Sequence, residues 1–232
     1  MNEQGVIALV KEVMPLTNSI LQIYLEPEQY LNYEAGQYLE ILVGEQWQAY
    51  SIANAPLGAR HYELHIRHSG GNPYEEPLFA QIQQQGSLRI RLPFGQCSLS
   101  RLQKKRPILF IAGGTGLAPV KAMIEQLLAT DDKRSYALWW AVRSESDLYM
   151  DEKLRQWQAH VPHFEYHSFL ADSGQKAMVE LIWEHYGETI HQYQLVLAGP
   201  FDMVYAARDK LLSRGVNRKR MIADAFDLEE KL

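Results

Sequence analysis

The sequence has a single cysteine, Cys97, among its 232 residues. One cysteine excludes an intrachain disulfide, and it also excludes an iron–sulfur cluster held by four cysteine thiolates. No apolar run approaches the roughly 18 residues of a transmembrane helix. Residues 1–5 have neither the basic nor the apolar region of a secretory signal peptide. We therefore expect a soluble protein of a reducing compartment, the cytoplasm.

The sequence also lacks the common arrangements of catalytic and metal-binding side chains. No G-x-S-x-G nucleophile elbow is present, and the eight histidines form no H-E-x-x-H motif. The net charge of −5 gives no indication of nucleic-acid binding, and the basic cluster at 104–106 is best interpreted as a solvated linker. From these absences we expect no metal site, no nucleic-acid partner and no membrane span.

Hydrophobic periodicity divides the chain into two parts near residues 98–106. Before this point, short alternating segments separated by turn residues predict an antiparallel barrel, interrupted by one helix at about 74–84. We expect a six-stranded Greek-key β-barrel domain over residues 1–100. Its predicted strands cover residues 6–13, 19–25, 37–43, 47–53, 61–67 and 87–92.

Beyond residue 103 the predicted strands alternate with helices, which is typical of a doubly wound parallel sheet. We therefore expect an α/β domain over residues 101–232. Its predicted strands are 108–112, 136–141, 164–169, 194–198 and 221–223, and its predicted helices are 117–128, 148–160, 176–186 and 202–214.

The segment 107–119, P-I-L-F-I-A-G-G-T-G-L-A-P, combines a buried strand, a glycine loop and the first turn of a helix. Gly113, Gly114 and Gly116 lack a Cβ, and Pro119 is tolerated in a first turn because its missing N–H would bond nothing there. Free N–H groups and the helix dipole favour an anion at such a terminus. The motif is neither a P-loop nor a complete G-x-G-x-x-G. The alternatives are the pyrophosphate of a dinucleotide or a plain tight connection.

A second buried strand, at 194–198, also ends in a glycine, in the sequence Gly199-Pro200-Phe201-Asp202-Met203. Ligands of a doubly wound sheet bind outside the carboxyl ends of its strands. Two such ends in one sheet predict a nucleotide site, although Gly199-Pro200 alone is equally typical of a turn. A nucleotide site without an acid, base or metal array indicates that a cofactor carries the chemistry.

Several short motifs follow one another along nearly the whole chain. They are G-Q-Y at 36–38, Q-A-Y-S at 48–51, L-H-I at 64–66, P-F-G at 93–95, A-G-G-T-G at 112–116, Arg143 with D-L-Y at 147–149, G-P-F-D-M at 199–203 and D-A-F at 224–226. Their order resembles that of the ferredoxin–NADP reductase superfamily, and within it the NAD(P)H:flavin oxidoreductases. The resemblance implies a flavin-binding barrel followed by a nicotinamide-binding domain.

The resemblance also implies roles for individual residues at the flavin. Tyr50 would pack on the flavin ring, and Ser51 would be the catalytic residue, hydrogen-bonded to flavin N5. Backbone groups at 64–66 would face the ring and the ribityl chain. Phe226 would cover the ring, and the alternative for this residue is core packing of the last strand. The implied flavin-binding residues are Gln48, Ala49, Tyr50, Ser51, Leu64, His65, Ile66 and Phe226.

The implied electron donor is NADH or NADPH, and the implied acceptor is riboflavin, FMN or FAD. Arg143 lies at the end of the second strand of the α/β domain, where contact with a 2′-phosphate would favour acceptance of NADPH as well as NADH. The alternative is that Arg143 caps or pairs within the domain. Gln48 departs from the arginine usual in the family, and an arginine would suit a flavin phosphate. Arg67, Arg89 and Arg91 are the candidates to supply the positive charge that is missing at position 48. The implied nucleotide-binding residues are Gly113, Gly114, Thr115, Gly116, Pro119, Arg143, Gly199, Pro200 and Met203.

Two other functions remain open on the sequence alone. The first is a reductase subunit that retains its flavin and passes electrons to a partner protein. The second is a non-catalytic nucleotide-binding subunit. The complete Q-A-Y-S and G-P-F-D-M motifs favour an enzyme over the second alternative.

Overall fold

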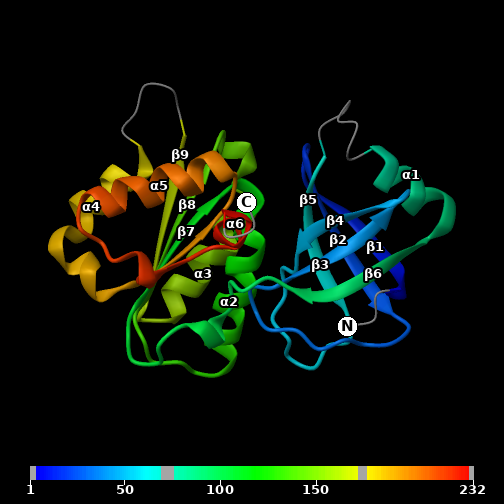
Figure 1. The fold of residues 1–232 in the computed structure, drawn as a ribbon, viewed down its shortest axis with the longest axis horizontal. Coiled ribbons are helices and arrows are strands. Elements are labelled where there is room, and N and C mark those ends of the chain that lie inside the picture. Colours follow the sequence, from blue (N-terminus) through cyan, green and yellow to red (C-terminus); the bar gives the residue numbers. More distant parts are fainter. Residues whose placement is uncertain (1–3, 69–75, 172–176, 230–232) are drawn as a thin grey trace.

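In the computed structural model, which describes residues 4–68, 76–171 and 177–229, the chain forms two domains that lie side by side (Figure 1). The strands of the first domain form one antiparallel sheet in the order β4-β3-β6-β1-β2-β5. A bridge between Ile52 and Leu64 brings the two edges of this sheet together, which confirms the expected barrel. The strands are β1 (Val6–Thr17), β2 (Ile20–Pro27), β3 (Tyr38–Val43), β4 (Gln46–Ser51), β5 (Tyr62–Arg67) and β6 (Ser87–Phe94).

The second domain contains a five-stranded parallel sheet in the order β11-β10-β7-β8-β9. The chain begins this sheet at its centre and winds outward in both directions, as predicted. The switch point lies between β7 and β10, where a doubly wound sheet opens a crevice for a ligand. The strands are β7 (Ile108–Gly113), β8 (Tyr136–Val142), β9 (Phe164–Leu170), β10 (Gln194–Ala198) and β11 (Met221–Ile222).

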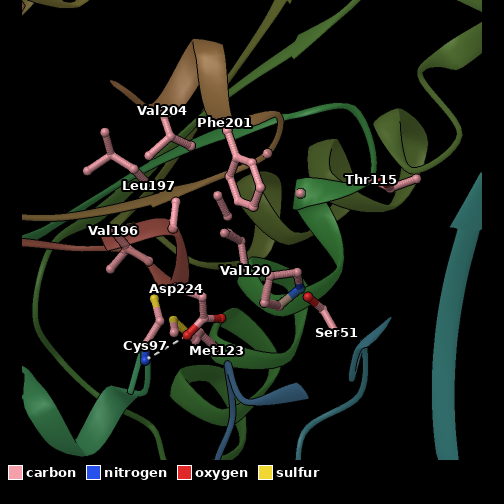
Figure 2. Close-up of a pocket in the computed structure, with 15 residues that line it drawn as sticks. Ser51, Cys97, Thr115, Val120, Met123, Val196, Leu197, Phe201, Val204 and Asp224 are labelled. Carbon is pink, nitrogen blue, oxygen red and sulfur yellow. Dashed lines mark hydrogen bonds between the residues drawn. The ribbon is translucent and has the colours of Figure 1, made fainter. Parts of the chain in front are cut away.

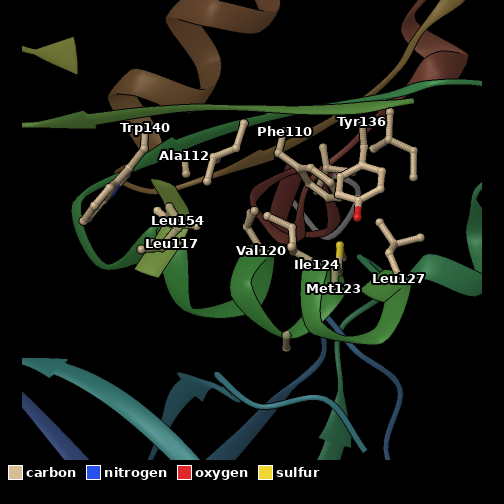
Figure 3. Packing of buried hydrophobic residues seen from close by; sticks show 14 of the residues in the cluster. Phe110, Ala112, Leu117, Val120, Met123, Ile124, Leu127, Tyr136, Trp140 and Leu154 are labelled. Atoms are coloured by element: carbon tan, nitrogen blue, oxygen red, sulfur yellow. The ribbon is translucent and has the colours of Figure 1, made fainter. Parts of the chain in front are cut away.

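Helices cover both faces of the parallel sheet. α2 (Leu117–Ala129) and α3 (Asp151–His160) pack on one face, and α4 (Met178–Tyr186) and α5 (Phe201–Ser213) pack on the other. Alternate residues of β7 therefore enter two different cores, and Figure 3 shows Phe110 and Ala112 in the core formed with α2. Burial on both faces explains why this strand is a continuous apolar run.

The structure differs from the predicted elements mainly at their ends. β1 runs to Thr17, past the predicted end at residue 13, with register shifts that interrupt its pairing with β2. α3 begins at Asp151 rather than 148, because the short 3₁₀ turn Glu145–Asp147 and two turn residues precede it. The helix α6 (Asp224–Glu229) was not predicted.

Two predicted helix starts, at 74 and 176, lie outside the described residues. The described helix of the barrel domain is α1 (Glu76–Gln85), which buries Leu78. Within the described part of the chain, no helix has the length and apolar character needed to cross a membrane.

Helix α2 lies between the two domains (Figure 1). Its side chains contact the barrel at the segment that follows β4. Lys121 donates a hydrogen bond to the carbonyl oxygen of Ala53 at 3.0 Å, and Glu125 accepts one from the N–H of Ala55 at 3.1 Å. The helix that follows the glycine loop is thus also the element that positions the second domain against the barrel.

Candidate functional site

The glycine loop Gly113–Gly116 lies at the carboxyl end of β7 and leads directly into α2. Gly114 has a φ of +53°, in the left-handed region that favours glycine. A Cβ on Gly116 would lie 2.3 Å from the carbonyl oxygen of Ala198, so only glycine permits this contact with the end of β10. The two glycine-containing strand ends identified in the sequence therefore meet backbone to backbone at the switch point.

A cavity of about 210 Å³ opens at this switch point, on the side that faces the barrel. Figure 2 shows Ser51, Thr115 and Asp224 around it. Ser51 comes from the last residue of β4, and the other two come from the α/β domain. Further lining residues are Cys97, Gly116, Pro119, Gly199 and the exposed Phe201. The cavity is therefore formed by both domains.

A second cavity, of about 480 Å³, lies against the open edges of β4 and β5. It shares Ser51 and Thr115 with the first cavity, so the two are adjacent. Most of the residues implied for flavin binding line it. They are Gln48, Ala49, Tyr50, Ser51, His65 and Ile66, joined by Gln46, Arg67, Thr115 and Ala118.

Within this second cavity, Gln48 and Tyr50 contact each other. The hydroxyl of Tyr50 donates a hydrogen bond to Oε1 of Gln48 at 2.7 Å. Both side chains are half-buried, and they lie two residues apart on β4, hence on the same face of the strand. Gln48 thus orients the ring of Tyr50, a role that an arginine at this position could not fill as a hydrogen-bond acceptor.

Of the three arginines considered as compensation for Gln48, Arg67 is the one that lies at the second cavity. Its Nη2 would lie 3.4 Å from a Cβ placed on Gly114. The two other arginines considered from the sequence are engaged elsewhere, since Arg91 pairs with Glu40 at 2.5 Å and Arg89 donates to the carbonyl oxygen of Gln4 at 3.1 Å. Arg67 directly follows the L-H-I motif at 64–66, and this position in the sequence indicates that it lies near the residues of that motif.

A third cavity, of about 820 Å³, extends from the glycine loop over the ends of β8 and β9. It is lined by Arg67 and Arg143, by Gly113, Gly114 and Thr115, and by Gly199, Pro200 and Met203. Thr115 lines all three cavities, so they are adjacent to one another around the glycine loop. The residues implied for nucleotide binding thus lie together here, apart from Gly116 and Pro119, which line the first cavity.

Two residues implied for flavin binding do not line these cavities. Leu64 is fully buried in the barrel core, where it forms the bridge with Ile52. Phe226 is 4% exposed and packs in the core of the α/β domain, with the guanidinium of Arg218 4.0 Å from its ring centroid. In this structure Phe226 thus packs as a core residue, which was the alternative to covering the flavin.

The C-terminal segment nevertheless reaches the site, through Asp224 at the start of α6. Its Oδ1 accepts a hydrogen bond from the N–H of Cys97 at 3.2 Å (Figure 2). Burial and the neighbouring carboxylate of Asp227 raise the pKa of Asp224 to about 7. Burial also raises the pKa of the Cys97 thiol, which is therefore neutral. The D-A-F motif contains Asp224, but the sequence analysis assigned this residue no role, because a single aspartate after a strand has no distinctive pattern.

A buried polar cluster connects the site to the domain interface. Glu63 receives hydrogen bonds from Lys121 at 3.0 Å and Gln22 at 2.6 Å, and its Oε1 lies 2.8 Å from Nε2 of His65. Burial alone would raise the pKa of Glu63, but the hydrogen bond with His65 and the charge of Lys121 lower it to about 2. Nδ1 of His65 lies 3.2 Å from the hydroxyl of Tyr149. His65, which lines the second cavity, is thus held from both domains.

Comparison with known proteins agrees with this geometry. The profile of the oxidoreductase NAD-binding domain matches residues 110–209. The NAD(P)H-flavin reductase of Vibrio harveyi is 30% identical over 232 residues, which cover 94% of this chain and 96% of that protein. The CDP-6-deoxy-L-threo-D-glycero-4-hexulose-3-dehydrase reductase of Yersinia pestis is 30% identical over 90% of this chain, which spans only 64% of that relative's length.

A solved structure supports the fold. The ferredoxin NADP+ reductase from Neisseria gonorrhoeae with bound FAD and NADP superposes with a TM-score of 0.79 at 20% sequence identity. The superposition covers 96% of this chain and 98% of that one. At this identity, the likeness supports the shared two-domain architecture rather than any particular substrate.

Proposed function

Because the chain belongs to the NAD(P)H-flavin reductase family of the ferredoxin–NADP reductase superfamily, we propose that it reduces flavin with a reduced nicotinamide nucleotide. In this proposal residues 1–100 bind the flavin and residues 101–232 bind the nucleotide. The observation that carries it is the position of Ser51 and Thr115, which line both the first cavity, at the switch point, and the second cavity, at β4 and β5. Two planar rings bound in these adjacent spaces would face each other.

The second cavity, of about 480 Å³, fits a flavin. The aromatic side chain of Tyr50 offers a flat apolar surface for a ring system, and its hydrogen bond to Gln48 fixes the orientation of that surface. Ser51 can both donate and accept a hydrogen bond, which suits a nitrogen that gains a hydrogen. Arg67 is placed to hold a phosphate oxygen with its charged fork. Riboflavin, FMN and FAD all remain candidates for this cavity.

The third cavity, which at about 820 Å³ is the large cavity of the site, fits a nicotinamide nucleotide. The open backbone at Gly114 and the N-terminus of α2 favour the pyrophosphate, and a side chain at 114 would project into this space beside Arg67. Arg143 lines the same cavity, where it would tolerate or attract a 2′-phosphate. Met203 and Pro200 line the approach to the switch point. We propose that NADPH is accepted as well as NADH.

When bound, the reduced nicotinamide supplies a hydride and the flavin accepts it. The protein contributes orientation, exclusion of water and a proton-holding group. Asp224 is the candidate for that group, because it lines the same cavity as Ser51 and its carboxyl is about half protonated near neutral pH. Lys121 and Glu63 hold the two halves of the site together.

Steady-state oxidation of NADH and NADPH, with riboflavin, FMN or FAD added in turn, tests the proposal directly. Turnover that requires added free flavin and releases it reduced is the expected result. No oxidation of either nucleotide with any flavin would overturn the proposal.

A second candidate is a reductase that retains its flavin and serves a partner protein. The Yersinia pestis relative is named as the reductase of a dehydrase, which favours the partner part of this candidate. Purified protein that keeps one flavin per chain through gel filtration would favour this candidate. The retained flavin would then be reduced by NADH without release, and electrons would leave only to an added acceptor protein.

A further inference from the structure

Three side chains with metal-binding donor atoms meet at the outer edge of the parallel sheet, away from the cavities. Glu165 and His167 lie two residues apart on β9 and therefore point to the same face. His185 approaches from the last turn of α4. The donor atoms of all three lie within 4.8 Å of one another. Nε2 of His167 and Nε2 of His185 lie 2.8 and 3.2 Å from the same oxygen, Oε1 of Glu165.

Neighbouring aromatic side chains hold each of these groups in place. Trp139, the register partner of His167 on β8, stacks on its imidazole with 4.2 Å between ring centroids and 22° between planes. Tyr186 packs edge-on against His185 at 4.7 Å, and its hydroxyl donates a hydrogen bond to Oε2 of Glu165 at 3.2 Å. Supporting contacts of this kind orient the ligands of protein metal sites.

We propose that Glu165, His167 and His185 form a binding site for a late first-row divalent cation such as Zn²⁺. Imidazole ligands favour Zn²⁺, Ni²⁺ and Cu²⁺ over Mg²⁺ and Ca²⁺. Ligands at about 2.0–2.1 Å around a tetrahedral Zn²⁺ are roughly 3.3 Å apart, so the observed nitrogen–oxygen distances need only small side-chain rotations. The three side chains are 28–43% exposed, so a cation can enter and water can complete its coordination.

The proposed site is independent of the reductase site. Its ligands do not line any of the three cavities described above. A bound cation would nevertheless tie β9 to the end of α4, and the opposite end of α4, at Met178, lines the large cavity together with Phe169 of β9. The cation would thus stiffen one wall of that cavity from outside.

Calorimetric titration of the chelator-treated full chain with Zn²⁺ tests the proposal, using protein without an affinity tag. One equivalent should bind with a Kd of about 10 μM or tighter. His167→Gln and His185→Gln should each weaken binding by about tenfold or more, since each removes one of three protein ligands. His160→Gln is the matched control, because His160 is an exposed histidine at the end of α3 and should leave the affinity unchanged.

Melting temperature gives a second readout that does not depend on activity. Zn²⁺ should raise the melting temperature of the wild type and of the control by binding the folded state, and at the same Zn²⁺ concentration it should raise that of the two ligand variants less. Thermal melting in the presence of chelator shows whether each variant is folded without metal. If His167→Gln has a much lower melting temperature than the wild type, the test rests on His185→Gln, whose side chain is more exposed. Equal Zn²⁺ affinity in the wild type and His185→Gln, or no binding at about 100 μM Zn²⁺, would overturn the proposal.

Discussion

Nζ of Lys121 lies 3.0 Å from Oε2 of Glu63, and this ion pair joins the nucleotide domain to the barrel with the two side chains only 7% and 6% exposed. Lys121 is on the helix that follows the glycine loop, and Glu63 is on the strand that carries His65, Ile66 and Arg67 to the second cavity. The pair therefore sets the distance between the two halves of the proposed site.

Removing one member of this pair should destabilise the protein strongly. Lys121→Met leaves Glu63 buried without its charge partner, which typically costs about 3–5 kcal/mol. Urea unfolding measures the loss, and Lys133→Met is the control, because Lys133 and Asp131 form an exposed pair worth less than about 1 kcal/mol. The double variant Lys121→Met, Glu63→Gln should recover part of the stability. If Lys121→Met were as stable as the control, the pair would not hold the domains.

Ser51 is expected to act on hydride transfer rather than on folding. Ser51→Ala should lower the single-turnover rate by about tenfold or more, because a hydrogen bond that strengthens in the transition state is lost. Stopped-flow measurement of flavin reduction checks this, and Ser146→Ala is the control, because Ser146 is an exposed serine whose hydroxyl lies 2.9 Å from that of Ser144. An unchanged rate in Ser51→Ala would remove this residue from the mechanism.

Arg67 should determine how well the protein distinguishes phosphorylated flavins from riboflavin. Without a charge at Gln48, riboflavin and FMN would be expected to bind within about tenfold of each other. In the wild type, Arg67 should strengthen the binding of FMN through its phosphate. Arg67→Gln should therefore weaken FMN binding by about tenfold to a hundredfold, the equivalent of one charged hydrogen bond, and should weaken riboflavin binding much less. Fluorescence titration measures both affinities. Arg89→Gln, at an exposed arginine outside the cavity, should change neither.

Asp224 should make both the stability and the activity of the protein fall as the pH rises. Its pKa in the folded protein is about 7, against 3.8 for an unperturbed aspartate, so burial disfavours the charged form. The stability contributed by this carboxyl is present in full below about pH 4 and is lost as the pH rises through 7. Asp224→Asn should therefore be the more stable protein above pH 7, by up to about 4 kcal/mol. Urea unfolding at pH 6 and pH 8 tests the sign.

The same variant should lose the pH dependence of the reaction. If protonated Asp224 serves the reaction, the kcat/KM of the wild type should fall above about pH 7, and Asp224→Asn should be slower but flat across that range. A wild type that is flat from pH 6 to 8, or a variant that retains the wild-type inflection, would exclude Asp224 as the proton-holding group.

Phe226 should behave as a core residue. Phe226→Ala opens a cavity beside Tyr205 and Arg218, and such changes cost about 3–5 kcal/mol. Flavin affinity of the folded protein should stay unchanged, because Phe226 packs in the core and does not line any of the three cavities. Unfolding and flavin titration of the one variant decide the matter. A several-fold loss of flavin affinity with little loss of stability would contradict the core role and support contact between Phe226 and the flavin.

Much of the architecture was determined by the sequence itself. Alternating segments predicted all six barrel strands, and the apolar strand before Gly113 predicted the centre of the parallel sheet. These features are local, since backbone geometry and the period of the apolar residues are decided within a few positions. The glycine loop was visible for the same reason, because only residues without a Cβ allow the close approach at Gly116. Family resemblance added Tyr50, Ser51 and Arg143.

Only the tertiary structure decided which side chains meet across the chain. Glu63 and Lys121 are 58 positions apart, and nothing near either residue in the sequence indicates the other. The same holds for His167 and His185 at the edge of the sheet, and for the contact of Asp224 with Cys97. Phe226 shows the limit most clearly, since the unpredicted helix α6 turns it into the core while Asp224, two residues earlier, lines the cavity. A side chain's direction at such a position follows from the packing of the whole domain, which no short stretch of sequence contains.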